Sequence, residues 1–375
     1  FHLTNPPYGT SFNITKQAGF QLNHNIKNLV GTSILTAGFE YLSDEIIDEI
    51  PVYNYLIEQR VFSLGSFVQS DWYLNENFNL LSGARIDKHS MLSHVVLSPR
   101  FSLLYKLNEN TQFRISYSTG FRAPQAFDTD LHISFAGGGV SRITLAEDLI
   151  EERSKSLSAS VNYDKLTQNY IYGFTLQAFY TRLNNAFFQD PVGEDDFGEV
   201  FVKRNGDGAT VQGFTLDFRA NFNQKFQIES GFTYQKSEYD EPIMYSIDLP
   251  LKKDFLRTPR KYAFTTLDYF INEKWNLSAN LVYTGPMDLV HMAGAPGQTE
   301  DTYFQSKKFN EIGVRLIYIQ KMIRSSIQIE YSLGIKNITN DYQSNFDTSK
   351  NRDSNFVYGP QNPRIFYFGM LLKSL

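Results

Sequence analysis

The region 285–307 gathers residue types that could bind a metal ion or an organic ligand. Met287, Asp288, His291 and Met292 stand close together in the chain, with Gly294 just beyond them. Thioether and imidazole groups together favour Cu(I), because soft sulfur donors select that ion. A loop that packs, or that contacts an organic ligand, explains the same residues. We therefore treat Met287, His291 and Met292 as candidate ligand-binding residues, and we expect no metal centre and no bound cofactor.

A second group of candidate residues lies in the region 120–152. Asp128, Asp130 and His132 offer polar contacts there, and Gly138 is the centre of a run of three glycines that would let the backbone approach a ligand. A solvated loop whose glycines form turns explains these residues equally well. The glycine run is not a phosphate-binding loop, because no Lys-Ser or Lys-Thr pair follows it.

Catalysis and nucleic-acid binding are both disfavoured by the composition. The chain has no cysteine, and none of its six histidines stands in a pattern with serine or aspartate that would activate a nucleophile. The formal net charge is −5, whereas a nucleic-acid-binding protein normally has a basic surface. We predict that the chain is not an enzyme and binds no nucleic acid.

The aromatic content indicates which kind of secondary structure holds these loops. Phe, Tyr and Trp make up 15% of the 375 residues, yet the mean hydropathy is only −0.34. No apolar stretch approaches the ~18 residues that a membrane-spanning helix needs. A chain that is rich in aromatic residues but apolar only at alternate positions is typical of a membrane β-barrel, which carries aromatic girdles on its outer face.

The hydrophobic period predicts strands along the whole chain. Phe214, Leu216 and Phe218, for example, alternate with polar neighbours. About fifteen such segments occur, most of them near the ~9–11 residues with which a tilted strand crosses a bilayer. We expect them at 12–25, 32–42, 60–74, 78–87, 95–106, 112–119, 153–163, 170–183, 211–222, 225–236, 260–271, 274–284, 308–319, 326–336 and 363–375.

The predicted connections alternate between short and long, as in an outer-membrane barrel with tight periplasmic turns and long outer loops. The long connections are expected at 43–58, 88–94, 120–152, 184–208, 237–259, 285–307 and 339–362. The first strand leads into a short turn, so an odd number of strands should precede it. We therefore expect an all-β, transmembrane antiparallel β-barrel with about fifteen strands of a barrel of about twenty-two, the size of the plugged transporters.

Several short motifs resemble those of TonB-dependent outer-membrane receptors, and the resemblance covers essentially all of residues 1–375. Two departures from the family pattern are Glu151, where proline is usual, and Thr215, where glutamate is commoner. The last residue, Leu375, also replaces the usual aromatic. The motifs are Ser118–Pro124 (STGFRAP), Leu149-x-x-Glu152-x-Ser154, Asn205-Gly206 with Val211-x-Gly213, Asn337–Asn340 (NITN), Arg352-Asp353, Tyr358-Gly359-Pro360 and Pro363-Arg364.

This resemblance implies an active transporter in the outer membrane of a Gram-negative bacterium. It implies uptake of a large, scarce ligand, with cobalamin and ferric siderophores favoured, and energy from the TonB complex. It also implies three kinds of partner: a plug domain and further barrel strands outside this chain, outer-membrane lipid including lipopolysaccharide, and a possible surface lipoprotein. A passive porin or a surface-binding barrel is the alternative.

Overall fold

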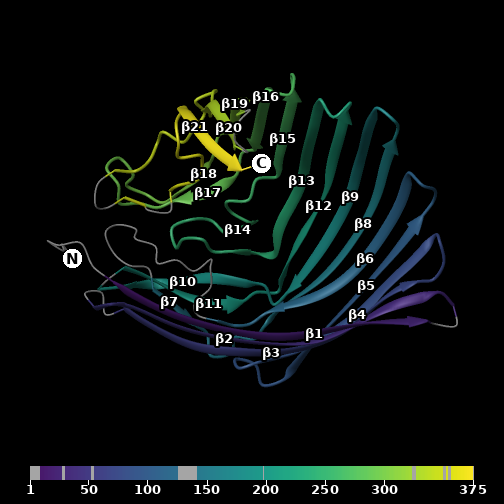
Figure 1. Cartoon of the computed structure of the whole chain (residues 1–375). Helices are drawn as coiled ribbons and strands as arrows, with labels where there is room; N and C mark the ends of the chain where they lie inside the picture. The colour runs from purple at the N-terminus through teal and green to yellow at the C-terminus, as the bar shows by residue number, and fades with distance from the viewer. Residues whose placement is uncertain are drawn as a thin grey trace.

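The computed structural model of the chain describes residues 9–27, 30–51, 55–125, 142–196, 198–322, 327–348, 352–353 and 356–374. Fifteen strands pair in chain order into one antiparallel sheet, which curves round from β1 to β21 (Figure 1) and forms the wall of a transmembrane β-barrel. They are β1 (Thr10–Lys27), β2 (Thr32–Ile50), β3 (Tyr55–Tyr73), β4 (Phe78–His89), β5 (Val95–Lys106), β6 (Thr111–Arg122), β8 (Glu152–Leu166), β9 (Tyr170–Asn184), β12 (Gly208–Phe222), β13 (Phe226–Ile243), β15 (Lys261–Phe270), β16 (Trp275–Thr284), β19 (Phe309–Lys321), β20 (Ile327–Lys336) and β21 (Ile365–Ser374).

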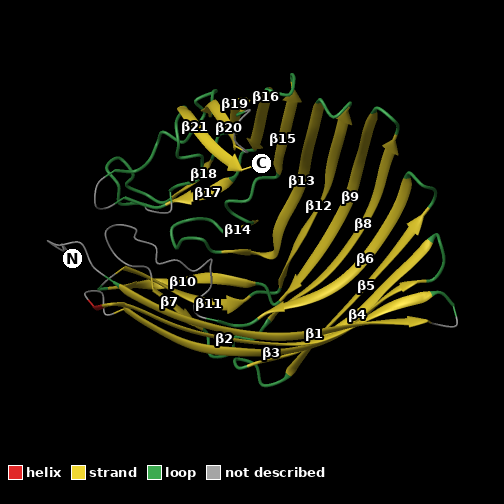
Figure 2. Cartoon of the chain, viewed as in Figure 1, coloured by secondary structure: helices red, strands yellow, loops and turns green. Residues whose placement is uncertain are grey.

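Six short strands lie in the long connections. Figure 2 shows most of them on the concave side of the main sheet. A three-stranded sheet has the order β10-β11-β7, β17 pairs with β18, and β14 pairs with β13. Their bounds are β7 (Arg142–Leu145), β10 (Phe187–Asp195), β11 (Gly198–Asn205), β14 (Lys252–Asp254), β17 (Asp288–His291) and β18 (Thr302–Gln305). None of the helical turns in the described ranges is long and apolar enough to cross a membrane.

The two faces of the sheet differ in polarity, as the alternating sequence predicts. On β12, Phe214, Leu216 and Phe218 are 40%, 42% and 40% exposed on one face. Asp217 and Arg219 lie on the other face, opposite Gly231 and Glu229 of β13. Large apolar side chains exposed in a continuous band belong in hydrocarbon, whereas the polar face lines a wet interior. The first face is therefore the lipid side and the second is the luminal side.

Aromatic rings on the lipid side form two levels. At the short-turn end, rings of neighbouring strands are in contact, stacked or tilted, in the pairs Phe78–Tyr105, Tyr105–Phe113, Tyr163–Phe174, Tyr170–Phe222, Phe222–Phe226, Trp275–Tyr318 and Tyr318–Tyr331. Nearer the other end, Phe214 contacts both Phe232 and Tyr234. From Phe222 to Phe214, at ~3.3 Å per residue and a tilt of ~40°, the levels are about 20 Å apart. This is close to the ~25 Å apolar band of outer-membrane barrels.

The short turns form where asparagine side chains replace backbone hydrogen bonds. The side-chain oxygen of Asn75 accepts hydrogen bonds from the backbone N–H groups of Asn77 and Phe78, both at 2.9 Å. Asn272 does the same for Lys274 and Trp275, at 2.9 and 3.1 Å. These local contacts stabilise tight hairpins and confirm that turn residues mark the ends of the strands.

The long connections contain more structure than the sequence predicts. The prediction of a long loop at 43–58 is wrong, because β2 and β3 stay paired from Ser43 and Phe62 to Ile50 and Tyr55. Ile46 and Ile50 are only 5% and 8% exposed in this extension, so burial on its luminal side stabilises the hairpin beyond the bilayer. The other long connections, except 88–94 and 339–362, contain the short strands or extend the wall strands.

Luminal glycines allow aromatic rings to lie flat on the wall. Gly38 faces Phe67, Gly231 faces Phe264 and Gly334 faces Tyr367 across neighbouring strands. A Cβ atom added at any of these glycines would come within 2.4 Å of the facing ring. The missing side chains therefore keep the interior open while the rings cover the backbone.

Candidate functional site

A hollow of about 310 Å³ opens on the luminal side where the long connections begin. It lies between the outer ends of β6 and β13 and the hairpin formed by β10 and β11. We call it the mouth pocket; it is lined by Arg122, Phe187, Phe188, Gln189, Phe201, Lys203, Tyr239, Ile243 and Tyr245. Two cationic and five aromatic side chains thus share one cavity.

Arg122 reaches the pocket because β6 ends there. It is the last residue of the strand and faces Glu152, the first residue of β8. Pro124 follows almost immediately and lacks the N–H group that a further ladder hydrogen bond would need. The STGFRAP motif is therefore the end of a wall strand, and its arginine lies at the outer mouth of the lumen.

The β10–β11 hairpin is held over the lumen by Asn205. Its side-chain N–H₂ donates to the carbonyl groups of Ile150 and Asn185, at 3.0 and 2.8 Å, and its side-chain oxygen accepts from the N–H of Ile150 at 2.8 Å. The N–H of Gly206 donates to Ala186 at 2.8 Å and closes the base of the hairpin. The Asn205-Gly206 motif is thus the anchor that sets the position of Phe187, Phe201 and Lys203.

Replacing Asn205 by Ala should loosen this hairpin without unfolding the wall. Three hydrogen bonds would be lost, each contributing roughly 0.5–1.5 kcal/mol, and two carbonyl groups would lose their donor. We expect faster proteolytic cleavage within 185–207 on intact cells, with the amount of folded barrel unchanged. Asn345→Ala, which removes a single contact to the hydroxyl of Tyr358 in another outer loop, is the control. Equal cleavage of the wild type and Asn205→Ala would show that the hairpin is held by other contacts.

Phe187 is the central side chain of the mouth pocket. The ammonium group of Lys203 lies 4.5 Å from the centre of its ring, and the guanidinium carbon of Arg122 lies 5.8 Å from it. Its backbone is fixed on both sides, since its N–H donates to Glu152 at 3.0 Å and its carbonyl accepts from the Tyr239 hydroxyl at 3.3 Å. Two cations are therefore held against one rigid aromatic ring.

Lys203 and Tyr245 are polar groups held in apolar surroundings. Lys203 is 2% exposed, and its ammonium group donates to the carbonyl of Gln125 at 3.0 Å. Burial raises the pKa of Tyr245, so its phenol stays protonated and donates to the carbonyl of Asp254 at 2.8 Å. Cations beside aromatic faces suit a flat ligand that carries negative charge.

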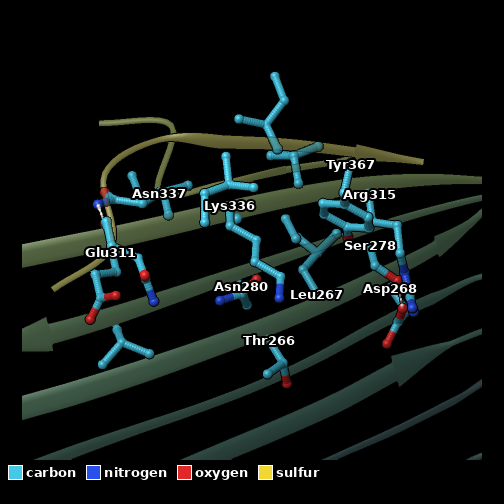
Figure 3. Close-up of a pocket in the computed structure, with 18 of the residues that line it drawn as sticks. Thr266, Leu267, Asp268, Ser278, Asn280, Glu311, Arg315, Lys336, Asn337 and Tyr367 are labelled. Atoms are coloured by element: carbon cyan, nitrogen blue, oxygen red, sulfur yellow. Dashed lines mark hydrogen bonds between the residues drawn. The ribbon is translucent and has the colours of Figure 1, made fainter. Parts of the chain in front are cut away.

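A larger hollow, of about 510 Å³, lies on the luminal wall of β15, β16, β19, β20 and β21. Figure 3 shows Asp268, Arg315 and Tyr367 at one end of it and Glu311 with Asn337 at the other. The Ser278 hydroxyl donates to the Asp268 carboxylate. This surface is wide and polar, as expected for a wall that meets another folded element or water.

The predicted site residues fall into two groups. Asp128, Asp130, His132 and Gly138 lie outside the described residues. Met287, His291 and Met292 lie in the outer connection between β16 and β19, and none of them lines the mouth pocket.

His291 is part of the packing between two outer loops. Its ring stacks on Phe356 with 3.6 Å between centroids, and its Nε2 lies 2.9 Å from the Asp347 carboxylate. The N–H of the next residue, Met292, donates to Asp353 at 3.0 Å. These contacts join the connection 285–308 to the connection 337–364. In the described ranges no three His, Cys, Asp or Glu side chains are grouped as metal ligands would be.

The sequence prediction missed the mouth pocket. Phe187 and Lys203 come from the predicted connection 184–208, and Tyr239 comes from the predicted connection 237–259. The usable signal was the alternation Val200, Val202 and Arg204 against Phe201 and Lys203, which indicates a strand directly before Asn205-Gly206. The acidic run Glu194-Asp195-Asp196 lies at the turn of this hairpin.

Solved structures with this fold include two siderophore receptors called PirA and the ferric-catecholate import receptor Fiu from Escherichia coli K12. PirA from Acinetobacter baumannii has a TM-score of 0.69 and 16% identity over 97% of this chain and 55% of its own. PirA from Pseudomonas aeruginosa has a TM-score of 0.68 and 15% identity, over 98% of this chain and 58% of its own. Fiu has a TM-score of 0.68 and 14% identity, over 96% of this chain and 54% of its own. At such identities the likeness concerns the fold.

A curated relative is the iron-regulated outer membrane virulence protein of Vibrio cholerae, 25% identical over 232 residues. The match covers 58% of this chain and 33% of the relative, so the chain spans about a third of that protein. Residues 2–309 match the family described as TonB dependent receptor-like, beta-barrel, whose members are receptors rather than enzymes. The chain belongs to this TonB-dependent receptor family and has the β-barrel fold of a Gram-negative outer-membrane protein.

Proposed function

We propose that the protein takes up a ferric siderophore across the outer membrane, with energy supplied by the TonB complex. The mouth pocket is the observation that carries this proposal. Arg122 and Lys203 supply positive charge, and Phe187, Tyr239 and Tyr245 supply ring faces. A ferric chelate with aromatic, negatively charged arms would be bound by charge-assisted hydrogen bonds and by cation–π contacts of the same side chains.

The relatives support an iron-related ligand. The Vibrio cholerae protein is described as iron-regulated, and solved structures of this fold are described as siderophore or ferric-catecholate receptors. The chain covers a third of the first and just over half of the others, so the activity of the whole protein is part of the proposal. Cobalamin carries no set of anionic aromatic arms, and the mouth pocket therefore favours the siderophore.

The remaining partners follow from the same proposal. A plug domain would lie against the polar luminal side, where Asp217, Glu229 and the hollow of Figure 3 offer hydrogen-bonding groups. The TonB complex would act on the plug from the periplasm. Lipopolysaccharide would cover the lipid side, and a surface lipoprotein could sit on the outer loops.

The outer-loop candidates would act above the mouth pocket. We propose that Asp128, Asp130, His132 and Gly138 contact the ligand from the connection between β6 and β8. Met287 and Met292 would form part of the rim. His291 would hold its loop in place through Phe356 and Asp347, because its ring and its Nε2 are already engaged there.

Uptake of radioactive iron by cells tests this function. We expect iron from a ferric siderophore to enter cells that express the complete gene product and not cells that lack it. Collapse of the inner-membrane proton gradient should stop uptake while leaving surface binding intact, because binding at the mouth needs no energy. Labelled cobalamin serves as the comparison ligand. Uptake that continues without the gradient would support a passive porin, and uptake of cobalamin alone would exclude the siderophore.

A further inference from the structure

The luminal side of β5 and β6 carries two arginines in the middle of the wall. Arg100 of β5 faces Ser118 of β6 and Gly83 of β4. Arg114 of β6 faces Leu104 of β5 and Ser160 of β8. Both arginines are exposed to the interior. Their neighbours Phe101, Phe113 and Ile115 point to the lipid side, so the two guanidinium groups belong to the lumen.

Several other luminal cations have acidic partners. Arg85 is paired with Asp87 and Glu40, Arg219 with Asp164, and Lys373 with Glu330. Arg100 and Arg114, by contrast, make neither an ion pair nor a side-chain hydrogen bond with any other residue that the structure describes. An ionisable group at bilayer depth that has no partner in the wall is free to act on something that passes or binds in the lumen.

The surroundings of the two arginines are small and uncharged. Ser102 and Ser116 lie between them, with 2.8 Å between their hydroxyl oxygens. Gly83 and Gly120 present no side chain to the lumen, and the neighbouring strand β8 presents a row of serines at 154, 156, 158 and 160. This strip of wall is therefore smooth, hydroxyl-rich and free of acidic groups between Arg122 and Arg114.

The strip begins at the mouth pocket. Arg122 lines the pocket, Arg100 lies at the level of Ser118, and Arg114 lies four residues further along β6. At ~3.3 Å per residue, three cationic side chains follow one another at intervals of about 13 Å from the outer mouth toward the periplasm. Glu152 faces Arg122 at the start of this row, and below that level an anion moving toward Arg114 would meet no acidic side chain of β5, β6 or β8.

We propose that this strip is the path by which an anionic ligand passes along the barrel wall, with Arg100 and Arg114 as successive binding points below the mouth pocket. The inference rests on the proposed uptake function and adds the route that the ligand takes. Serine and glycine leave room for a bulky chelate, and exposed guanidinium groups attract it without holding it tightly. The other possible occupant, a carboxylate-bearing surface of the plug, predicts a different result in the experiment below.

The test compares three variants of the complete gene product in the outer membrane. Arg100→Gln combined with Arg114→Gln removes both charges, and Arg100→Lys with Arg114→Lys keeps them. Lys155→Gln is the matched control, since it removes one exposed cation from the lipid side of the adjacent strand. The probes are radioactive iron bound to an anionic tricatecholate and to a neutral trihydroxamate.

We expect the Gln pair to reduce the rate of tricatecholate uptake about tenfold, which corresponds to ~1.4 kcal/mol in the barrier to passage. Surface binding of the tricatecholate at low temperature should stay within about twofold, because the mouth pocket is intact. The Lys pair and Lys155→Gln should transport at the wild-type rate.

Three results would overturn the proposal. Unchanged tricatecholate uptake in the Gln pair would show that the strip is not the path. A wild type that transports only the neutral trihydroxamate would exclude an anionic ligand. Increased entry of a large antibiotic through the Gln pair would assign the arginines to holding a plug. A wild type that transports neither chelate would contradict the uptake function itself, which separates the two failures.

Discussion

Replacing Lys203 by Met should weaken binding of a ferric tricatecholate by a factor of about 10 to 100. A hydrogen bond to a charged group contributes roughly 1.5–3 kcal/mol, and each 1.4 kcal/mol is a tenfold change in affinity. Lys203 is the buried cation of the mouth pocket, and its ammonium group lies 4.5 Å from the centre of the Phe187 ring. Methionine keeps a long, unbranched apolar side chain and removes the ammonium group, with its charge and its hydrogen bond to Gln125. Titration of labelled chelate on cells with a collapsed proton gradient measures the effect.

The chain offers a matched control for this experiment. Lys307 also lies over a phenyl ring, 5.1 Å from the centre of Phe309, and pairs with Asp341 at 3.1 Å, but it does not line the mouth pocket. Lys307→Met should therefore leave the affinity unchanged. If the two variants bind the chelate equally well, the mouth pocket is not the binding site.

A single methyl group at Gly213 should prevent the barrel from reaching its folded form. A Cβ atom there would lie 2.1 Å from the backbone oxygen of Tyr234 and 2.9 Å from the Cα of Gln235. Backbone atoms of the paired strand cannot rotate away, so β12 and β13 would have to separate. Overpacking typically costs ~1–3 kcal/mol where side chains can adjust, and more is expected where they cannot. The fraction of protein that migrates as a folded barrel on unheated gels should fall sharply in Gly213→Ala.

Gly19→Ala provides the comparison for Gly213→Ala. A Cβ atom at Gly19 of β1 would meet only the backbone oxygen of Phe39, at an ordinary 3.5 Å. This variant should fold as the wild type does. Equal folding of the two variants would mean that the wall tolerates strand separation at β12 and β13.

The strands of the wall could be predicted because lipid imposes a strict period on one face. Phe214, Leu216 and Phe218 must be apolar, and the residues between them need only be polar. Beyond the bilayer this constraint ends. Asp44, Glu45, Asp48 and Glu49 make the extension of β2 look like a loop, although Ile46 and Ile50 keep it paired.

The mouth pocket was harder to predict because its residues meet only in three dimensions. Phe187, Lys203 and Tyr239 come from three separate strands, and no local spacing relates them. Met287, His291 and Met292 show the opposite case: their spacing suggested a ligand site, yet His291 packs against Phe356 and Asp347 from another loop. Sequence proximity therefore identified a packing contact, while the cavity depended on a hairpin anchored by Asn205.

The row of aromatic rings from Phe78 to Tyr331 also determines how the barrel wall responds to force. Aromatic side chains favour the boundary between headgroups and hydrocarbon, so a closely spaced row of them on neighbouring strands resists sliding of the wall along the membrane normal. A pulling force applied from the periplasmic end would therefore not displace the barrel wall. Such a force would act on whatever lies inside the barrel, while the wall itself stays in place in the membrane.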